Sequence, residues 1–374
     1  MKKNKVNIDR TLFLWALERA VKVIRTDPSH LDMYKAMKLT MADDTLTVHG
    51  GNGSYAIAIN CMAEGDMEPV LASSALASVV ALMRGDVITL EKDGQTLRLT
   101  DGLDRSSEQV LSADPNHYLT AKTLPEEPNR MTAAAWQKLV AVVTSAPRFL
   151  ATKSDSFVVT SLAEGIRVFT VNNVGAAVWD VPTEAITRKL PILAHLPIEL
   201  VQLVPPGSNG LLFAVDNGVF TIADEAGLWR LSSSMYQTNS IVDLAPFLAQ
   251  PSAATLTTTT PELSRCVSIS DNYVITVGSG NGSVSAGRIR LTSTPAGVVF
   301  RTAGDGRNFD GSPLVAEYTG EFDLTLAGQV TKGPLGYLRG RVKAEIGDAH
   351  VYLTADPYDG VRYILMPLKA VWSD

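Results

Sequence analysis

The sequence predicts an α+β protein built from repeated units, each with one helix followed by antiparallel strands. Three observations predict this fold class. The hydrophobic period changes from about 3.6 to 2 residues within each unit. Short turn motifs join the strands. The same order of elements recurs at a spacing of roughly 50–65 residues, which indicates an internal repeat. No alternation typical of a parallel βαβ sheet occurs, so an α/β fold is not expected.

The first unit begins with an amphipathic helix predicted over residues 9–25. Phe13, Leu17 and Ile24 recur at helical spacing, Asp9 is a plausible N-cap, and Pro28 marks the end of the helix. Alternating strands are then predicted over residues 37–41, 46–48 and 55–59.

The second and third units repeat this order. The second has a helix over residues 71–84, ended by Gly85, and the third has a helix that begins at Met131, contains Trp136 and ends at Pro147. The strands predicted to follow them cover residues 87–91, 96–100, 106–112, 157–160, 166–170 and 176–181.

The last three units are less regular. The helices predicted for them cover residues 198–204 and 261–268 and an interrupted segment around Gly333-Pro334, in a unit that starts at Leu324. Their predicted strands cover residues 210–215, 219–223, 228–231, 273–277, 288–292, 341–346, 350–354 and 362–367.

Two breaks in composition group the six units in pairs. Residues 124–130 are rich in proline and charge, and residues 250–261 contain a threonine run between two prolines, so both are predicted to be linkers. Three domains follow, over residues 1–125, 126–250 and 251–374, each with two helices and two sets of antiparallel strands.

Composition narrows the class of protein. The 374 residues are 45% hydrophobic and 19% charged, which excludes wholesale disorder. No apolar run reaches the roughly 18–20 residues of a membrane span, and the first residues lack a signal-peptide pattern, so we expect a soluble cytoplasmic protein with no membrane partner. Two cysteines are too few for a disulfide framework. The net charge of −6 argues against non-specific nucleic-acid binding.

Motifs for catalysis are lacking. The five histidines are scattered singly, and no HExxH, CxxC or G-x-S-x-G spacing occurs at a suitable place. The glycine-rich residues 49–54 and 278–283 lie between strand-like runs rather than before a helix, so we predict hairpin turns and not phosphate loops. We therefore expect no catalytic residue, no metal site and no cofactor, and we expect the loop carboxylates of Asp43, Asp44, Asp305 and Asp310 to be solvated.

Six units in three domains without a catalytic constellation resemble the bacterial DNA polymerase III β subunit, the sliding clamp. Residues 361–369, VRYILMPLK, look like the terminal strand of that family, and residues 167–173, RVFTVNN, lie where the family carries Arg-(x)3-Thr-Asp-Gly-His-Arg-Leu. Residues 70–86 resemble the second helix of its first domain. The likeness covers nearly the whole chain and is weakest over residues 278–320.

The resemblance implies a non-catalytic processivity factor. Two chains would form a head-to-tail homodimeric ring of six domains around duplex DNA, with helices lining the hole. A ring of this kind tethers the replicative polymerase by topology, so basic side chains facing the hole need make only weak contacts to phosphates. The candidates lie on helices or adjacent loops, where ordinary solvation is the alternative reading: Arg19, Lys22, Arg25, Arg84, Lys138, Arg148, Lys153, Arg265, Lys332 and Arg339.

The resemblance also implies a hydrophobic cleft in which the polymerase, the clamp loader and repair factors insert short linear peptides. A methionine-containing apolar surface suits such capture, because methionine repacks around varied anchors. Carried over by position, the cleft residues are Val171, Asn172, Asn173, Val174, Gly175, Ala176, Ile241, Ile364, Leu365, Met366 and Pro367. For the terminal strand, plain sheet core is the alternative.

This chain departs from the family at the cleft and at the ring interface. The family's Gly-His-Arg-Leu is replaced by residues 173–176, Asn-Val-Gly-Ala, without basic or imidazole groups, as expected for a divergent or phage-encoded member. Residues 106–110 and 266–269 should meet across subunits, and the first of these is unusually polar. Two other readings stay open: a structural phage or surface protein of repeated β-rich domains, and an enzyme whose site is assembled from distant loops.

Overall fold

The computed structural model describes residues 4–26, 35–147, 156–172, 174–237, 239, 241–277, 284–304 and 307–368. The chain divides into two compact units, described here one at a time. Unit 1 comprises residues 1–133, 187–192 and 199–236, and unit 2 comprises residues 134–186, 193–198 and 237–374. Both combine helices with antiparallel sheets, so the α+β class is confirmed. The three-domain division stays a prediction.

Unit 1 is organised around a branched sheet that contains thirteen strands, one of which begins in unit 2. The sheet runs in the order β13-β9-β15-β16-β17-β4-β1-β6-β7-β8, and β2, β3 and β5 branch from it. Its strands are β1 (Lys5–Asp9), β2 (Ala36–Ala42), β3 (Thr45–Gly51), β4 (Tyr55–Asp66), β5 (Val70–Ser73), β6 (Val87–Asp93), β7 (Thr96–Thr100), β8 (Arg105–Gln109), β9 (Asn129–Thr132), β13 (Ile186–Thr187), β15 (Gly210–Asp216), β16 (Val219–Asp224) and β17 (Trp229–Ser234).

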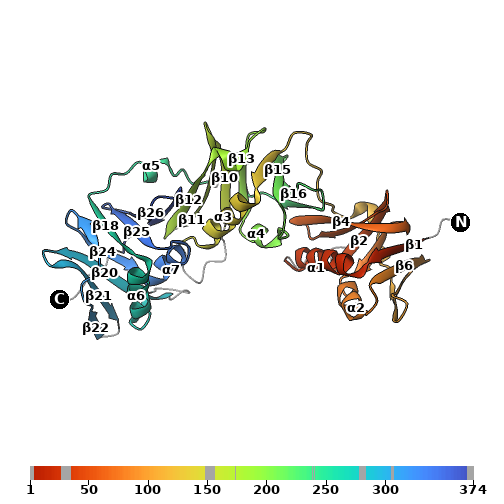
Figure 1. Cartoon of the computed structure of the whole chain (residues 1–374), viewed down its shortest axis with the longest axis horizontal. Coiled ribbons are helices and arrows are strands. Elements are labelled where there is room, and N and C mark those ends of the chain that lie inside the picture. Colours follow the sequence, from red (N-terminus) through yellow and green to blue (C-terminus); the bar gives the residue numbers. More distant parts are fainter. Residues whose placement is uncertain are drawn as a thin grey trace. The chain divides into compact units, whose positions relative to one another are not determined.

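The helices of unit 1 are α1 (Arg10–Thr26), α2 (Leu76–Leu82) and α4 (Leu200–Leu203). The predicted first helix is confirmed with its cap, because the Asp9 carboxylate accepts a hydrogen bond of 2.8 Å from the backbone N–H of Leu12. Its apolar face is fully buried at Phe13 and Leu17. The helix packs on β3 and β4 and lies beside α2 (Figure 1).

Unit 2 contains two sheets. A nine-stranded sheet has the order β14-β10-β11-β12-β27-β26-β25-β18-β23, and a five-stranded sheet has the order β19-β20-β21-β22 with β24 also paired to β20. The strands are β10 (Ser156–Leu162), β11 (Gly165–Asn172), β12 (Gly175–Val181), β14 (Leu193–Pro197), β18 (Ala254–Thr259), β19 (Val274–Val277), β20 (Val284–Thr294), β21 (Gly297–Gly304), β22 (Arg307–Asp310), β23 (Glu317–Thr319), β24 (Asp323–Ala327), β25 (Arg341–Ile346), β26 (Val351–Asp356) and β27 (Val361–Leu365).

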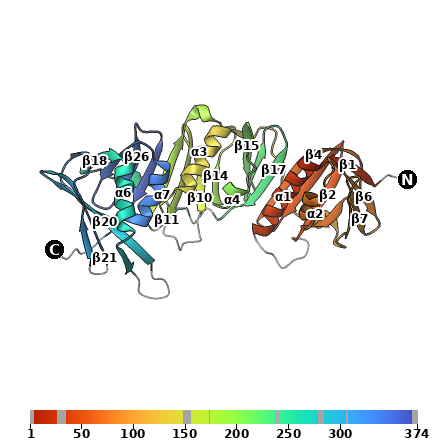
Figure 2. The ribbon, with the colours of Figure 1, turned by 60° about the horizontal axis from the view of Figure 1, so that its bottom comes forward.

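The helices of unit 2 are α3 (Ala133–Thr144), whose first residue belongs to unit 1, α5 (Ala245–Leu248), α6 (Thr260–Ser270) and α7 (Gly328–Tyr337). The last two lie side by side and both pack on β20 (Figure 2). Along the chain, α6 is followed by the strands β19–β24, and α7 is followed by β25–β27, as the predicted order of one helix followed by strands requires.

Several sequence predictions are wrong in detail. Met131, the predicted start of the third helix, lies in β9, and α3 begins at Ala133. Residues 70–73 form a strand, with Val70 opposite Leu39 of β2, and the helix predicted from residue 71 begins only at Leu76. The second predicted linker contains β18. Every second residue of this strand, Ala254, Leu256 and Thr258, is buried. Threonine has a high β propensity, so the threonine run that suggested a linker continues the sheet.

The first glycine-rich segment is a hairpin, as predicted. Gly51 ends β3 and Tyr55 begins β4, while a Cβ at Gly50 would lie 2.6 Å from the carbonyl oxygen of Ala20. Glycine at residue 50 therefore lets α1 approach the sheet closely. The second glycine-rich segment, residues 278–283, lies outside the described residues.

The two segments expected at a ring interface differ in their surroundings. Strand β8 is the last strand at one edge of the unit 1 sheet. Residues 266–269 belong to α6, where Cys266 and Val267 are buried in the core and do not reach the surface. The expectation that this segment faces another chain is wrong for those two residues. In unit 2, β22 lies at one edge of the five-stranded sheet and is paired only with β21.

Glu108 of β8 makes the stability of unit 1 depend on pH. Its half-buried carboxylate accepts a hydrogen bond of 3.2 Å from the backbone N–H of Ser73, and burial raises its pKa from 4.5 to about 7. The folded state thus holds a proton that the unfolded state releases between pH 4.5 and 7. This stability is complete below pH 4.5 and is lost as the pH rises through 7.

We therefore expect Glu108→Gln to be more stable than the unmodified protein at pH 8, by about 1–2 kcal/mol after allowance for partial solvent exposure. At pH 5 the two should be nearly equal, because glutamine keeps the acceptor oxygen and lacks the charge. Urea denaturation at both pH values measures this, with Glu64→Gln on the exposed side of β4 as the control for loss of one charge. An equal difference at both pH values would contradict the assignment.

Candidate functional site

An apolar groove of about 450 Å³ lies in unit 2, beside the end of the terminal strand. Nine residues line it, and eight of them have no polar side chain. They are Val171, Asn172, Gly175, Ala176, Val242, Leu244, Phe247, Ile364 and Met366. None of these residues carries a charge, so the groove favours an uncharged apolar occupant.

One wall of the groove is the turn between β11 and β12. The Asn172 side chain holds this turn, because its Nδ2 donates to the carbonyl of Pro147 at 2.7 Å and its Oδ1 accepts from Val174 N and Gly175 N at 3.0 and 3.1 Å. The polar atoms of Asn172 are therefore already engaged in the fold. Its place in the groove is structural, and the groove surface stays apolar.

The terminal strand β27 forms the floor. It pairs with β12 in antiparallel register, with Gly175 opposite Leu365 and Ala176 opposite Ile364. Beyond the strand, the backbone N–H of Met366 donates to the carbonyl of Val174 at 3.2 Å. This last hydrogen bond extends the pairing by one step and fixes Met366 at the groove.

The opposite wall is the segment that contains α5. Leu244 is buried and Phe247 is half-buried against the core cluster formed by β10, β11, β12, β26 and β27. The Tyr352 hydroxyl donates to the carbonyl of Phe247, and Asp243 Oδ1 accepts from Ala245 N at 2.9 Å. The Tyr352 contact attaches this helix of a single turn to the sheet, and the Asp243 contact lies within the segment itself.

The structure brings together most of the described residues that the sequence analysis placed in a cleft. Six line the groove: Val171, Asn172, Gly175, Ala176, Ile364 and Met366. Ile241 packs on the core cluster beside it, and Val174 and Pro367 are half-buried without lining it. Leu365 is fully buried with no exposed surface, and Asn173 lies outside the described residues.

Sequence reasoning missed three lining residues, Val242, Leu244 and Phe247. They belong to a short segment without helical or strand periodicity, which offers no pattern to detect. The residue Ile241 was selected nearby, and an apolar count over residues 241–248 would have included the missed ones.

Five of the predicted phosphate-contacting residues have partners of their own: Lys22, Arg84, Lys138, Arg265 and Lys332. Lys138 lies 3.1 Å from Asp359, Arg265 lies 3.1 Å from Glu262, and the Lys332 ammonium lies 4.0 Å from Asp271. The ammonium of Lys22 donates to the carbonyl of Gln202, a contact between α1 and α4 of unit 1. The positive charges on these helices are thus partly neutralised.

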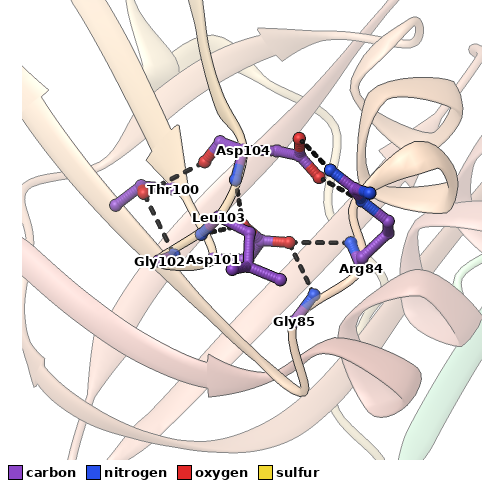
Figure 3. Close-up of polar contacts among 7 residues, drawn as sticks. All are labelled: Arg84, Gly85, Thr100, Asp101, Gly102, Leu103 and Asp104. Atoms are coloured by element: carbon purple, nitrogen blue, oxygen red, sulfur yellow. Dashed lines mark hydrogen bonds and ion pairs between the residues drawn. The ribbon is translucent and has the colours of Figure 1, made fainter.

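Arg84 shows this pairing most clearly (Figure 3). Its guanidinium makes two hydrogen bonds of 3.2 Å to the carboxylate of Asp104. Asp101 beside it accepts hydrogen bonds from the backbone N–H groups of Asp104, Gly85, Leu103 and Arg84, which hold the pKa of its carboxyl well below the usual range. Two carboxylates therefore offset the positive charge at this loop.

The other predicted cations are distributed as follows. Arg19 is half-buried in α1, and Arg339 is exposed after α7. The side chain of Arg25 and the whole of Arg148 and Lys153 lie outside the described residues.

Nucleophilic and metal-binding chemistry finds little support in the described part of the chain. Burial raises the pKa of the Cys61 and Cys266 thiols to about 12, so both are protonated at neutral pH. Burial lowers the pKa of His49 to about 4, and its Nε2 lies 3.0 Å from the Thr40 hydroxyl. Within the described ranges, no three His, Cys, Asp or Glu side chains gather as a metal site would require.

No helix in the described part of the chain is long and apolar enough to cross a membrane.

Gly175 sets the shape of the groove floor, and its replacement tests the geometry. A Cβ at this residue would lie 2.2 Å from the Ile364 carbonyl oxygen and 3.0 Å from Cβ of Pro147. We expect Gly175→Ala to destabilise the protein by about 1–3 kcal/mol, because the strands must separate to admit the methyl group. The midpoint of urea denaturation measures this.

The matched control is Gly336→Ala in α7. A Cβ there meets nothing within 4 Å, so alanine should stabilise the helix by about 0.5–1 kcal/mol. Equal effects of the two substitutions would show that the close approach of β12 and β27 at Gly175 is not a constraint.

The sequence matches no protein-family model. No curated protein matches it either. Solved structures match over nearly the whole chain. The DNA polymerase III subunit beta from Pseudomonas aeruginosa has a TM-score of 0.84 at 14% identity, with 98% of this chain and 100% of that chain covered. The beta subunit from the DNA polymerase of Streptococcus pyogenes has a TM-score of 0.83 at 13% identity, with the same coverage.

The DNA polymerase sliding clamp from Bacillus subtilis has a TM-score of 0.81 at 11% identity, with 99% of this chain and 100% of that chain covered. Identity at this level carries no information on shared binding residues, but the agreement extends over all the repeated units. The chain therefore has the fold of the bacterial DNA polymerase III β subunits, the DNA polymerase sliding clamps.

Proposed function

We propose that this protein is a DNA sliding clamp, a non-catalytic processivity factor of the cytoplasm. The observation that supports the proposal most is the match of 98% of the chain to complete DNA polymerase III β subunits at TM-scores above 0.8. A fold alone does not specify a function. The apolar groove in unit 2 adds a site with the properties that a tethering protein needs.

A clamp acts as a closed ring, which we propose to be a homodimer of two chains joined head to tail. A heterologous interface of this kind needs two different surfaces on each chain. Among the edges of the described sheets are β8, at one end of the unit 1 sheet, and β22, at one end of the five-stranded sheet of unit 2. Exposed edges present unpaired backbone groups that can pair with another strand, so these are the edges we propose for ring closure.

The helices would face duplex DNA in such a ring. Several of their cations are paired with carboxylates, as at Arg84, Lys138 and Arg265. Contacts to phosphates would then be few and weak, and the affinity would depend little on sequence. Weak contacts suit a ring that must slide, because the ring is retained by topology and not by affinity.

The groove would capture short apolar segments of the replicative polymerase and of the clamp loader. Met366 and the half-buried Phe247 provide apolar surface, and an unbranched methionine side chain can repack around different anchors. Without charged lining residues, such peptides would bind through buried apolar area, with little dependence on salt.

Retention on circular DNA tests the topological mechanism. The protein loaded on a nicked circular plasmid by a clamp loader should remain bound through gel filtration, and cleavage of the plasmid by a restriction enzyme should release it, because an open end lets the ring slide off. Linear DNA with both ends blocked by bound streptavidin is the matched control and should retain the protein. Equal loss from the circular and linear forms would contradict the ring.

Substitutions in the groove test peptide capture. We expect Phe247→Ala and Met366→Ala each to weaken the binding of a fluorescein-labelled peptide from the C-terminus of the replicative polymerase about tenfold, since each removes apolar contact area worth about 1.5 kcal/mol. Fluorescence anisotropy measures the Kd.

Val315→Ala is the matched control for these variants. Val315 is 76% exposed and lies outside the groove, so its truncation should leave the Kd unchanged. Circular dichroism of all three variants verifies the fold. Unchanged binding by the groove variants would place the partner site elsewhere.

A further inference from the structure

We propose that the C-terminal segment of this chain, residues 369–374 with the sequence KAVWSD, binds in the groove of its own chain through Val371 and Trp372. The segment would compete there with partner peptides, and this second part rests on the proposed function. The segment itself lies outside the described residues, so the argument depends on the groove, on the chain that leads from it and on the chemistry of the six residues.

The groove selects an uncharged apolar occupant. Its nine lining residues carry no charge, and the polar atoms of Asn172 are used within the turn that it holds. An ammonium or carboxylate placed inside would lose its hydration without a partner. The occupant must therefore present aliphatic or aromatic groups, with any charge kept outside.

The C-terminal segment has this pattern. Ala370, Val371 and Trp372 form an apolar run between the charged Lys369 and Asp374. A tryptophan that leaves water gains more from burial than most side chains, and its indole N–H can stay at the rim. The two charges flank the run and would remain in solvent.

The chain that precedes the segment begins at the groove. Met366 lines the groove, and two residues later the N–H of Leu368 donates to the carbonyl of Thr325 in β24 at 2.9 Å. Trp372 follows Leu368 by four residues, which span at most about 14 Å when extended. The two steps along the chain from Met366 to Leu368 span at most about 7 Å, so a reversal of the segment brings Trp372 within reach of the groove.

Attachment to the groove makes even a weak contact effective. A segment linked by a few residues has an effective concentration on the order of 1 mM at its site. If the segment alone binds with a Kd of about 0.1 mM, it occupies the groove about ten times more often than it leaves it open. A partner peptide would then have to displace the segment, so its apparent Kd would be about ten times higher. Weak apolar segments would be excluded from the groove in this way.

Fluorine NMR on the full chain tests the docking without any partner. The protein is labelled with 5-fluorotryptophan, and Trp372→Phe assigns one of the five tryptophan resonances to Trp372. We expect that resonance to be displaced from its position in the free peptide KAVWSD. Coincidence of the two positions would overturn the proposal.

Two matched variants place the contact in the groove. Val242 lines the rim and is 43% exposed, so Val242→Glu adds a charge there without opening the core, whereas Val315→Glu adds the same charge outside the groove. Val242→Glu should return the Trp372 resonance to the free-peptide position, and Val315→Glu should not. A displacement that disappears on dilution would show binding to a second copy and would overturn binding within one chain.

The competition is measured separately, by anisotropy of the fluorescein-labelled polymerase peptide. Removal of residues 369–374 should lower its Kd about tenfold, as the effective-concentration argument requires, and Trp372→Ala should have nearly the same effect. Equal Kd values for the full and shortened chains would overturn the competition. If the peptide binds neither chain, the peptide-capture part of the proposed function fails, while the NMR result still decides whether the segment docks.

Discussion

The pairing of β12 with β27 is the interaction on which the rest of unit 2 depends. It joins residues 175–179 to residues 361–365, nearly two hundred residues apart, and makes one sheet of nine strands. The absence of a side chain at Gly175 permits the strands to meet at their end, where a Cβ would clash with Ile364. The groove exists because the ladder ends there while Met366 continues along Val174. Its floor is therefore part of the sheet, and its opposite wall is the segment of residues 241–248, which Tyr352 attaches to that sheet.

Regular elements could be predicted from sequence because period and caps are local properties. The helix after Asp9 and the strands of unit 2 needed only the spacing of their own residues. Strand β18 could not, since a threonine run fits a linker as well as a strand until its partners β25 and β23 are known. The same reason explains why residues 71–73 were assigned to a helix, because a short apolar run fits both the helical and the strand period. Tertiary pairing decided between alternatives that local pattern left equal.

The candidate site divides along the same line. Residues of the groove on β12 and β27 were found through the resemblance of two sequence segments, but Phe247 lies on a helical turn of four residues that has no period. Charges were the harder case. A count of lysines and arginines on helices does not reveal that Lys138 is held by Asp359, which is 221 residues away. The sequence therefore identified cations that could contact phosphate, but it did not show the carboxylates that already pair with them.

An uncharged groove and partly neutralised cations have one physical consequence in common. Charged contacts fix register and steer association, and they weaken with salt. Where they are missing, selection must come from shape and from competition among apolar groups, whose contact free energies differ by small amounts. The groove, with its turn held by Asn172 and no charged lining residue, offers an apolar anchor shape and buried area but no charge to pair with. A segment of the same chain that occupied the groove would raise the apparent Kd of every partner by the same factor, because each partner would have to displace it. It would therefore exclude weak apolar anchors at a given concentration, while the order of preference among partners would still be set by their own contacts in the groove.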